Sequence, residues 1–352
     1  MCSASTYDPA LETLLLPFAS GRLPWPKDGA LFLRARTGAA LQRHALPGLV
    51  CEQSFRPDAE ALERAGLSVR ASATEAGETY PLVLVLPPRQ RDESRALMAR
   101  AVASTRPGGI VVASASNNEG ARSAEADLAQ LAGGIESMVK NKCRVFWTPP
   151  LQSAPNPALM ADWLALDAVR PIADGRFKSR PGLFAWDRID PASQLLADHL
   201  PADLHGAAAD LGAGFGFLAA KLLERCPKIT SVDLYEAEGR ALDVARTNLA
   251  DFAQRAALDF RWHDVTGGLP RRYDVIVTNP PFHTQTRVDR PDIGQRFIAV
   301  AAASLNPGGS LWMVANRHLP YEEVLADHFA RMRKVAERDG FKIIEAVKGH
   351  SR

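Results

Sequence analysis

The sequence is poor in cysteine and has no long apolar run. Its four cysteines, Cys2, Cys51, Cys143 and Cys226, lie far apart and form no CxxC pair. That spacing indicates neither a zinc site nor a disulfide framework, so we expect no metal and a reducing compartment. No stretch approaches 18 consecutive apolar residues, and the short apolar run at residues 14–18 has no basic flank before it. We therefore expect a cytoplasmic protein with neither an export signal nor a membrane span.

A large excess of one charge sign is also missing. The formal net charge is +2, so total charge alone does not indicate a nucleic-acid partner. Basic residues nevertheless gather in two places. The first group is Arg170, Arg176, Lys178, Arg180 and Arg188, and the second is Arg271, Arg272, Arg287, Arg290 and Arg296. Such groups attract a phosphate-rich partner, although scattered arginines can equally form a solvated face.

The length and composition are those of a soluble two-domain protein. Hydrophobic residues make up 46% and charged residues 23% of the 352 positions. One ordinary core does not fill a chain of this length, so we expect two domains, residues 1–165 and 166–352. Several prolines indicate a linker across residues 145–168, and Pro and Gly near the start indicate a lead-in with a short helix near residues 11–16.

Short apolar runs alternate with helix-like segments in both halves. In the first half they lie at residues 30–33, 49–51, 67–69 and 82–86. In the second half they lie at residues 207–210, 229–235, 258–262 and 273–278. This alternation predicts βαβ units and a parallel sheet in each half, so the expected fold class is α/β.

The two halves also repeat one another in sequence. Residues 80–88 align with residues 273–281 at an offset of 193, and the Pro-Gly-Gly that ends at Gly109 aligns with the one that ends at Gly309, at an offset of 200. Two landmarks in the same order predict a tandem duplication of one domain. The second copy carries seven more residues between the landmarks. Leu86 stands where the second copy has Asn279, and Arg89 where it has Phe282, so we expect the first copy to be degenerate.

Asn279 follows a run of β-branched residues, 275–277, which is typical of a buried parallel strand. Pro280 and Pro281 cannot continue a sheet ladder, so the strand must end at Asn279. Ligands of open α/β sheets bind at the carboxyl ends of the strands. The sequence therefore predicts that a carboxamide, a proline carbonyl and an aromatic ring face a crevice there, a combination suited to a planar amine.

A glycine-rich turn lies about 70 residues upstream. Asp210 is followed by Gly212, Gly214 and Gly216, and then by a predicted helix at residues 217–224. Glycines let the backbone approach a ligand and open the helix N-terminus toward it. The spacing is not the G-x-G-x-x-G of dinucleotide binders, and the acid would repel a pyrophosphate but meet an ammonium group. The corresponding turn of the first copy, residues 34–40, has one glycine and two arginines.

The Asn-Pro-Pro-Phe motif that starts at Asn279 resembles the signature of S-adenosylmethionine-dependent amino-methyltransferases. With His283, the lead segment 180–194 and residues 314–320, it resembles the bacterial rRNA (guanine-N2-)-methyltransferases of the small-subunit type. The resemblance covers residues 170–350 well and the N-terminal half only in outline. It implies a Rossmann-like class I methyltransferase fold, with a degenerate N-terminal copy and a catalytic C-terminal copy.

The resemblance also implies roles for individual residues. Asn279 and Pro280 would accept hydrogen bonds from the target amine, and Phe282 would stack on the base. The implied S-adenosylmethionine site comprises Asp210, Gly212, Gly214, Gly216, Glu236, Asp264 and Asn279. In it Glu236 accepts the ribose hydroxyls, with Asp233 as second candidate, and Asp264 receives the adenine amine. The implied substrate contacts are Pro281, His283, Arg287 and Arg290, although His283 can equally pack or cap. Segment 180–194 helps to roof the cofactor, while its aromatic residues, Phe184 and Trp186, are expected to pack.

The function implied is methylation of the exocyclic N2 of a guanine in ribosomal RNA, with 16S rRNA of the small subunit favoured. The alternatives are 23S rRNA, another amine such as adenine N6 or a protein glutamine, and a non-catalytic RNA-binding protein. The intact Asn279 and glycine turn argue against the last. We expect ribosomal RNA or a ribosomal subunit as partner, no membrane, and a monomer whose duplicated domains form an internal pseudo-dimer.

Overall fold

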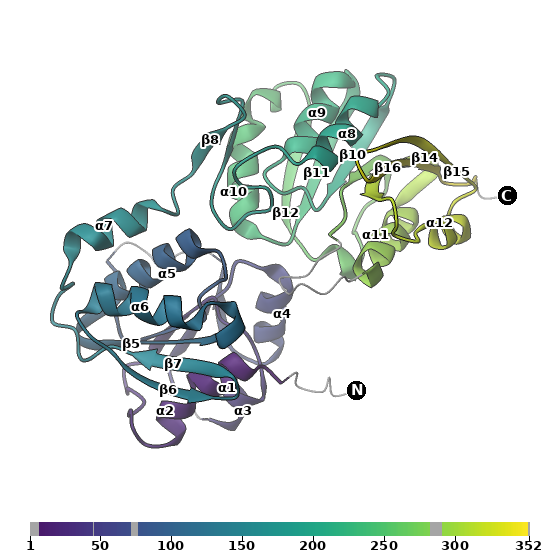
Figure 1. Cartoon of the computed structure of the whole chain (residues 1–352). Coiled ribbons are helices and arrows are strands. Elements are labelled where there is room, and N and C mark those ends of the chain that lie inside the picture. The colour runs from purple at the N-terminus through teal and green to yellow at the C-terminus, as the bar shows by residue number, and fades with distance from the viewer. Residues whose placement is uncertain (1–6, 45, 72–76, 282–290, 351–352) are drawn as a thin grey trace. The chain divides into compact units, whose positions relative to one another are not determined.

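The computed structural model describes residues 7–44, 46–71, 77–281 and 291–350 (Figure 1). The chain divides into two compact units, Met1–Ala168 and Val169–Arg352. Within the described ranges, none of the helices combines the length and the apolar composition that a membrane span requires.

The first unit is built on a seven-stranded sheet of order β3-β2-β1-β4-β5-β7-β6. Its strands are β1 (Ala30–Leu33), β2 (Leu49–Glu52), β3 (Ser68–Arg70), β4 (Tyr80–Val85), β5 (Thr105–Ser116), β6 (Glu136–Lys140) and β7 (Cys143–Trp147). Its helices are α1 (Pro9–Leu14), α2 (Leu16–Ala19), α3 (Ala39–Arg43), α4 (Arg56–Arg64), α5 (Arg91–Ala103), η1 (Asn117–Glu119), α6 (Ala121–Ala132) and α7 (Pro157–Ala165). Strands β1 to β5 are parallel, whereas β7 runs antiparallel to both β5 and β6.

The second unit contains a seven-stranded sheet of order β12-β11-β10-β13-β14-β16-β15 and a small pair, β8 and β9. Its strands are β8 (Arg170–Ile172), β9 (Phe177–Ser179), β10 (His205–Leu211), β11 (Lys228–Glu236), β12 (Ala257–Trp262), β13 (Tyr273–Thr278), β14 (Leu305–Asn316), β15 (Arg331–Arg338) and β16 (Phe341–Val347). Its helices are α8 (Pro191–His199), α9 (Phe217–Arg225), α10 (Gly239–Asn248), η2 (Ala250–Phe252), η3 (Val265–Gly267), α11 (Pro291–Ala303) and α12 (Glu322–His328).

The two sheets have the same strand order, which confirms the duplication. Strands β5 and β14 are both 12 residues long, and each shifts register against its parallel neighbour at the corresponding place, between Tyr80 and Leu82 and between Tyr273 and Val275. Helices α5 and α11 both have 13 residues and start 200 positions apart. The α/β fold class is therefore confirmed, as two Rossmann-like sheets.

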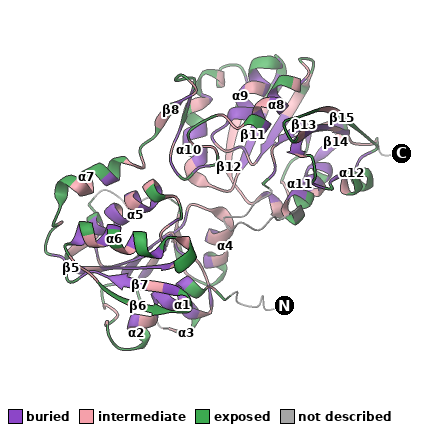
Figure 2. Ribbon diagram, in the orientation of Figure 1, coloured by how far each residue is buried: buried purple, intermediate pink, exposed green. Residues whose placement is uncertain are grey.

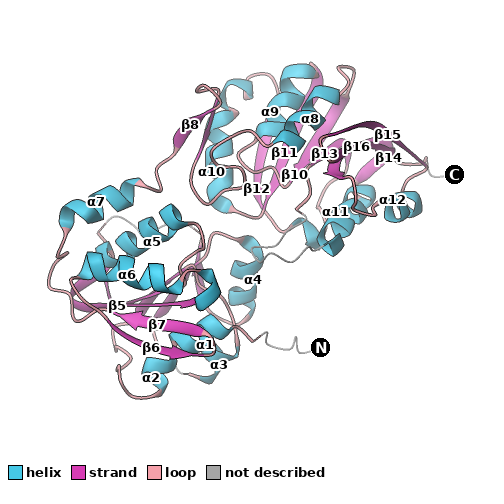
Figure 3. Ribbon diagram, in the orientation of Figure 1, coloured by secondary structure: helices cyan, strands magenta, loops and turns pink. Residues whose placement is uncertain are grey.

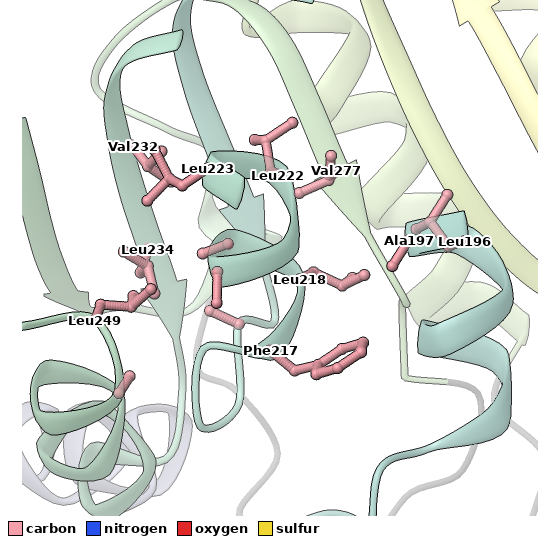
Figure 4. Packing of buried hydrophobic residues seen from close by; sticks show 14 of the residues in the cluster. Leu196, Ala197, Phe217, Leu218, Leu222, Leu223, Val232, Leu234, Leu249 and Val277 are labelled. Carbon is pink, nitrogen blue, oxygen red and sulfur yellow. The ribbon is translucent and has the colours of Figure 1, made fainter. Parts of the chain in front are cut away.

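Hydrophobic clusters lie on both faces of the second unit's sheet. Buried residues are shown in purple in Figure 2, and the helices that flank the sheet in cyan in Figure 3. Helices α8, α9 and α10 pack on one face, where Leu196, Leu218 and Leu222 meet Val232 and Val277 of the strands (Figure 4). Helices α11 and α12 pack on the other face. A sheet that is covered on both sides needs strands that are apolar in succession, which explains the β-branched run of β13.

The linker expected at residues 145–168 is wrong in two places. Residues 145–147 belong to β7, and Val145 and Phe146 are fully buried. Pro157 starts helix α7 instead of preventing it, because proline fits the first turn of a helix. Asn156 caps this helix, and Trp163 is buried beneath the Arg95 guanidinium. The antiparallel pair at one edge of each sheet was also not expected, since periodicity alone does not give strand direction.

Candidate active site

The glycine-rich turn lies between β10 and α9. All three of its glycines have positive φ, 73° at Gly212, 54° at Gly214 and 88° at Gly216. At Gly216 a Cβ would also lie 3.2 Å from Ala245 Cβ of helix α10 and 3.2 Å from Cδ1 of Leu249, which follows that helix. Glycine is therefore required for the shape of the turn and for close packing of α9 on α10. The glycines themselves add no side chains before the N-terminus of α9, although Ala213 and Phe215 stand between them.

Asp210 is the penultimate residue of β10 and is completely buried. Its Oδ2 accepts a hydrogen bond of 3.0 Å from the backbone N–H of Ala219, in the first turn of α9. Its Oδ1 is also buried and meets no hydrogen-bond donor within the part of the chain that the structure describes. Burial raises the pKa of Asp210 to about 7. An orphaned, buried carboxylate oxygen of this kind is suited to a cationic ligand group.

Glu236 ends β11 and is half-buried. Its Oε2 accepts from the Gly214 N–H at 2.7 Å, and its Oε1 accepts from the Glu238 N–H at 2.8 Å. Burial raises its pKa. The carboxylate is thus held directly against the glycine turn.

Asp233, the second candidate for the ribose acid, lies elsewhere. It sits three residues earlier on β11, so its side chain faces the opposite side of the sheet. There it is buried, forms an ion pair with Arg271 at 3.0 Å and accepts a hydrogen bond of 2.6 Å from the Tyr273 hydroxyl. The geometry therefore favours Glu236.

Asp264 follows β12 and caps the short helix η3. Its Oδ1 accepts from the backbone N–H of Thr266 at 2.9 Å and from the Thr266 hydroxyl at 2.7 Å. These bonds fix the carboxylate at the carboxyl edge of the sheet.

Asn279 comes directly after β13 and is half-buried. Its Nδ2 donates hydrogen bonds to Asp190 Oδ2 at 3.0 Å and to Ser193 Oγ at 2.9 Å. The preceding Thr278 donates from its hydroxyl to the Leu211 carbonyl at 2.7 Å, which ties the end of β13 to the start of the glycine turn. Pro280 is buried and Pro281 is exposed.

The glycine turn and Asn279 line the same pocket. Its lining comes from three segments of the chain, namely Phe184, Ala185, Asp190 and Ser193, then Gly212, Ala213, Gly214, Phe215, Phe217 and Leu218, and finally Asn279. The carboxamide and the glycine turn therefore share one cavity. Asp210, Glu236 and Asp264 are not among the residues that line this pocket.

Sequence reasoning missed three pocket residues. Phe184 was expected to pack, but its side chain is 64% exposed at the pocket. Asp190 caps helix α8, and its Asp-Pro-x-Ser pattern is a recognisable helix start. That pattern predicts α8 but gives no sign that Asp190 and Ser193 also reach Asn279, 86 to 89 positions away.

Several expected site residues lie outside the described residues, namely Phe282, His283, Arg287 and Arg290. Of the other arginines in the second basic group, Arg271 pairs with Asp233, and Arg296 donates to the Thr266 carbonyl at 2.8 Å. In the first group, Arg170 lies over the Trp186 ring and Arg188 pairs with Asp187 at 2.8 Å. Several of these arginines therefore make contacts within the protein. The other basic residues of the two groups stay candidates for contact with phosphate groups.

The first unit has different residues at the equivalent positions. Leu33 and Leu211 occupy the same place in their sheets, because they pair with Val85 and Thr278, 193 positions apart. The next residue is Arg34, with φ of 55°, where the second unit has Gly212. By the same register Gln53 replaces Glu236, and it donates from Nε2 to the Ala35 carbonyl at 2.7 Å. The carboxylate and the open glycine turn are both lost.

The residues of the second unit fit S-adenosylmethionine. The three glycines of the turn leave its backbone open to a ligand, the buried Oδ1 of Asp210 can face a cation, and Glu236 lies against the turn. Within the described ranges, no group of three or more His, Cys, Asp or Glu side chains could hold a metal ion.

Comparison with known proteins agrees with this geometry. The methyltransferase small domain model matches residues 174–345. The chain is 34% identical over 266 residues to ribosomal RNA small subunit methyltransferase C of Pseudomonas aeruginosa, covering 74% of this chain and 76% of that protein. It is 29% identical over 352 residues to the protein of the same name from Klebsiella pneumoniae, covering 97% and 98%.

A solved structure of the T. thermophilus 16S rRNA N2 methyltransferase RsmC, in complex with AdoMet and guanosine, matches with a TM-score of 0.80. The match covers 98% of this chain and 93% of that one at 24% identity, a level that supports the fold alone. The family expected from the Asn279 motif is confirmed by the sequence relatives, and the chain belongs to the ribosomal RNA small subunit methyltransferase C family.

Proposed function

We propose that this chain transfers a methyl group from S-adenosylmethionine to the exocyclic N2 of a guanine in 16S rRNA. The observation that carries the proposal is the shared pocket, which is lined by both Asn279 and the glycine turn between β10 and α9. A methyl donor held by the turn would meet an amine held by Asn279. The names of the curated relatives support the rRNA of the small subunit as acceptor.

The guanine amine is a weak nucleophile because its lone pair is delocalised into the ring. S-adenosylmethionine supplies an electrophilic methyl group on a sulfonium centre. The Asn279 Oδ1 and the Pro280 carbonyl accept the two N–H bonds of the amine, so the nitrogen moves toward tetrahedral geometry as positive charge grows on it. No general base is needed before transfer, and the chain contributes mainly orientation.

The cofactor is held by residues of the second unit alone. Gly212, Gly214 and Gly216 give its methionine part close access to backbone, and Asp210 lies behind them as a counter-charge for its cation. Glu236 accepts the ribose hydroxyls and Asp264 receives the adenine amine. Asn279 completes this site at its methyl end.

The acceptor guanine must lie unpaired in a loop or be extruded from its helix, because in a helix its N2 amine is paired and its faces are stacked on neighbouring bases. Phe282 stacks on the extruded base, and Pro281, His283, Arg287 and Arg290 contact the surrounding RNA. Of these, only Pro281 lies within the described residues, where it is exposed.

The first unit serves as a docking domain for RNA. The chain acts in the cytoplasm as a monomer whose two duplicated domains form an internal pseudo-dimer.

The experiment supplies labelled S-adenosylmethionine with naked rRNA, with each ribosomal subunit and with a ribosome-free protein fraction, all from cells that lack the enzyme. The product is digested and its labelled component identified. Label in N2-methylguanosine from 16S rRNA is the expected result. Label in 23S rRNA, in N6-methyladenosine or in methylglutamine, or no transfer to any acceptor, would reject the proposal.

A further inference from the structure

The hydrogen bonds of Asn279 define which way its carboxamide points. Among the described residues, the side chain makes its hydrogen bonds through Nδ2, one to the Asp190 carboxylate at 3.0 Å and one to the Ser193 hydroxyl at 2.9 Å. The NH2 group is thus directed toward α8. The amide is planar, so Oδ1 must face away from α8. The reversed orientation would place the amide oxygen against a carboxylate, with no proton between them.

Asp190 and Ser193 are themselves held together. Asp190 Oδ2 accepts from the Ser193 backbone N–H at 2.8 Å and from the Ser193 hydroxyl at 3.1 Å, and it caps helix α8. The hydroxyl proton is therefore given to Asp190, which leaves the Ser193 oxygen free of its own proton on the side toward Asn279. The arrangement presents two acceptors to one carboxamide.

The first unit contains the same helix without the same contact. Helix α1 packs on β5 and β7 as α8 packs on the equivalent strands β14 and β16. It starts with the same Asp-Pro-Ala sequence, in which Asp8 accepts from the N–H groups of Ala10 and Leu11 at 3.0 and 3.1 Å. The helix-capping aspartate is therefore present in both copies.

The two polar residues that contact the capping aspartate in the second copy are both replaced by leucine in the first copy. Leu11 stands where α8 has Ser193, 182 positions later, and Leu86 stands where the second copy has Asn279. Both leucines are buried in one hydrophobic cluster. Asp8 has no carboxamide to hold, and it pairs with Arg36 at 3.2 Å instead. Capping alone thus explains the aspartate in the first copy, but it does not explain Ser193 and Asn279 in the second.

We propose that Asp190 and Ser193 are positioning residues for methyl transfer, which fix the Asn279 carboxamide with its oxygen toward the acceptor amine. The Asp190 carboxylate also polarises the amide through the N–H bond, which increases the negative charge on Oδ1 when positive charge grows on the amine. Neither residue needs to touch the substrate. This inference rests on the proposed function for the identity of the acceptor, but not for the orientation of Asn279.

The test compares Ser193→Ala, Asp190→Asn and the matched control Asp8→Asn, which alters the same cap in the first unit. Asparagine caps a helix as well as aspartate does, so both cap variants should keep the melting temperature of the wild type. We expect kcat to fall about 10-fold in Ser193→Ala and about 100-fold in Asp190→Asn. Losses of this size are typical when a reacting group is displaced from its productive position. Asp8→Asn should keep the wild-type kcat, and cofactor affinity measured by calorimetry should be unchanged in all three.

A double-mutant cycle separates positioning from stability. In the Asn279→Ala background, Ser193→Ala and Asp190→Asn should cause little further loss, because the group that they orient is gone. Fully additive losses, or a fall in kcat that only follows the melting temperature, would overturn the proposal.

A second readout does not depend on the identity of the acceptor. In NMR spectra of the full chain, the Asn279 side-chain NH2 protons should exchange slowly with water in the wild type and faster in Ser193→Ala. Equal exchange in both proteins would also overturn the proposal. If instead exchange behaves as expected but no RNA is methylated, the proposed function fails while the positioning of Asn279 stands.

Discussion

In the proposed function, Asn279 is the residue that contacts the acceptor amine. Its carboxamide is held by α8 and lies at the end of the central strand β13, next to the glycine turn. A preorganised polar group costs nothing to orient at the moment of reaction, so its removal acts on the transition state more than on binding.

We predict that Asn279→Ala lowers turnover by roughly 10² to 10³, the usual cost of losing one such group. Cofactor affinity should stay close to that of the wild type, because Asn279 faces the methyl acceptor. Single-turnover methylation and calorimetry measure the two effects, with Asn118→Ala, an exposed asparagine of the first unit, as control. Near-normal turnover in Asn279→Ala would remove it from the reaction.

The buried Asp210 carboxyl group leads to a prediction about how the stability of the protein depends on pH. Because burial raises its pKa to about 7, the folded and cofactor-free protein keeps a proton that the unfolded chain releases above its usual pKa of about 4. The contribution of the Asp210 carboxyl group to the free energy of unfolding is therefore greatest below about pH 4. It decreases as pH rises toward 7, by up to about 1.4 kcal/mol per pH unit for one proton.

Asp210→Asn should therefore unfold with a weaker pH dependence between pH 5 and 7 than the wild type, as measured by urea denaturation. Some dependence should remain, since burial raises the pKa of Glu236 in the same direction. An unchanged pH dependence in Asp210→Asn would mean that the carboxyl group is not protonated in the folded state.

At the scale of elements, the sequence predicts the central strands well. The expected runs at residues 30–33 and 273–278 coincide with β1 and β13, because short apolar runs bounded by turn residues are typical of buried strands. Helix α7 and the antiparallel strands were not predicted. Their formation depends on packing, such as Trp163 under Arg95, and proline content alone was misleading there.

In the candidate site, too, some residues could be predicted from sequence motifs, whereas others are identified only by tertiary contacts. The sequence ranks Glu236 before Asp233, and the strand register adds the reason, since a shift of three residues reverses the side of the sheet. Phe184, Asp190 and Ser193 enter the pocket through tertiary contacts between segments far apart in sequence. Short motifs identify groups that act through their own backbone turn, and they do not identify the groups that come from another element.

The turns after β1 and β10 lead to a prediction about stoichiometry. Arg34 and Arg36 follow β1, and Gln53 stands in place of Glu236, so the first unit offers cations and an amide where a cationic cofactor needs carboxylates. We expect one S-adenosylmethionine per chain in a calorimetric titration. The double variant Asp210→Ala, Glu236→Ala should abolish binding, whereas Gln53→Ala should not change it. Two sites, or binding that survives the double variant, would contradict the assignment.

At the scale of the whole molecule, two copies of one topology have different residues at the same edge of the sheet. Each copy has its own hydrophobic clusters on both sheet faces. The first copy has therefore kept a complete fold after losing the residues that would bind a cofactor. A retained fold without that site is consistent with a role in binding or in support of the second unit.

The last prediction tests that role through the dependence of RNA binding on salt. Each phosphate that a Lys or Arg side chain neutralises releases counterions, so the logarithm of RNA affinity should fall linearly with the logarithm of salt concentration. If the first unit docks RNA, residues 169–352 alone should bind 16S rRNA more weakly than the full chain and with a smaller salt slope, because fewer phosphates are neutralised. Filter binding at several salt concentrations measures both quantities, and S-adenosylmethionine binding by the shortened chain confirms that its site is intact. Equal affinity, equal slope and equal methylation by the two chains would assign the whole RNA interface to the second unit, and the first unit would then act through stability alone.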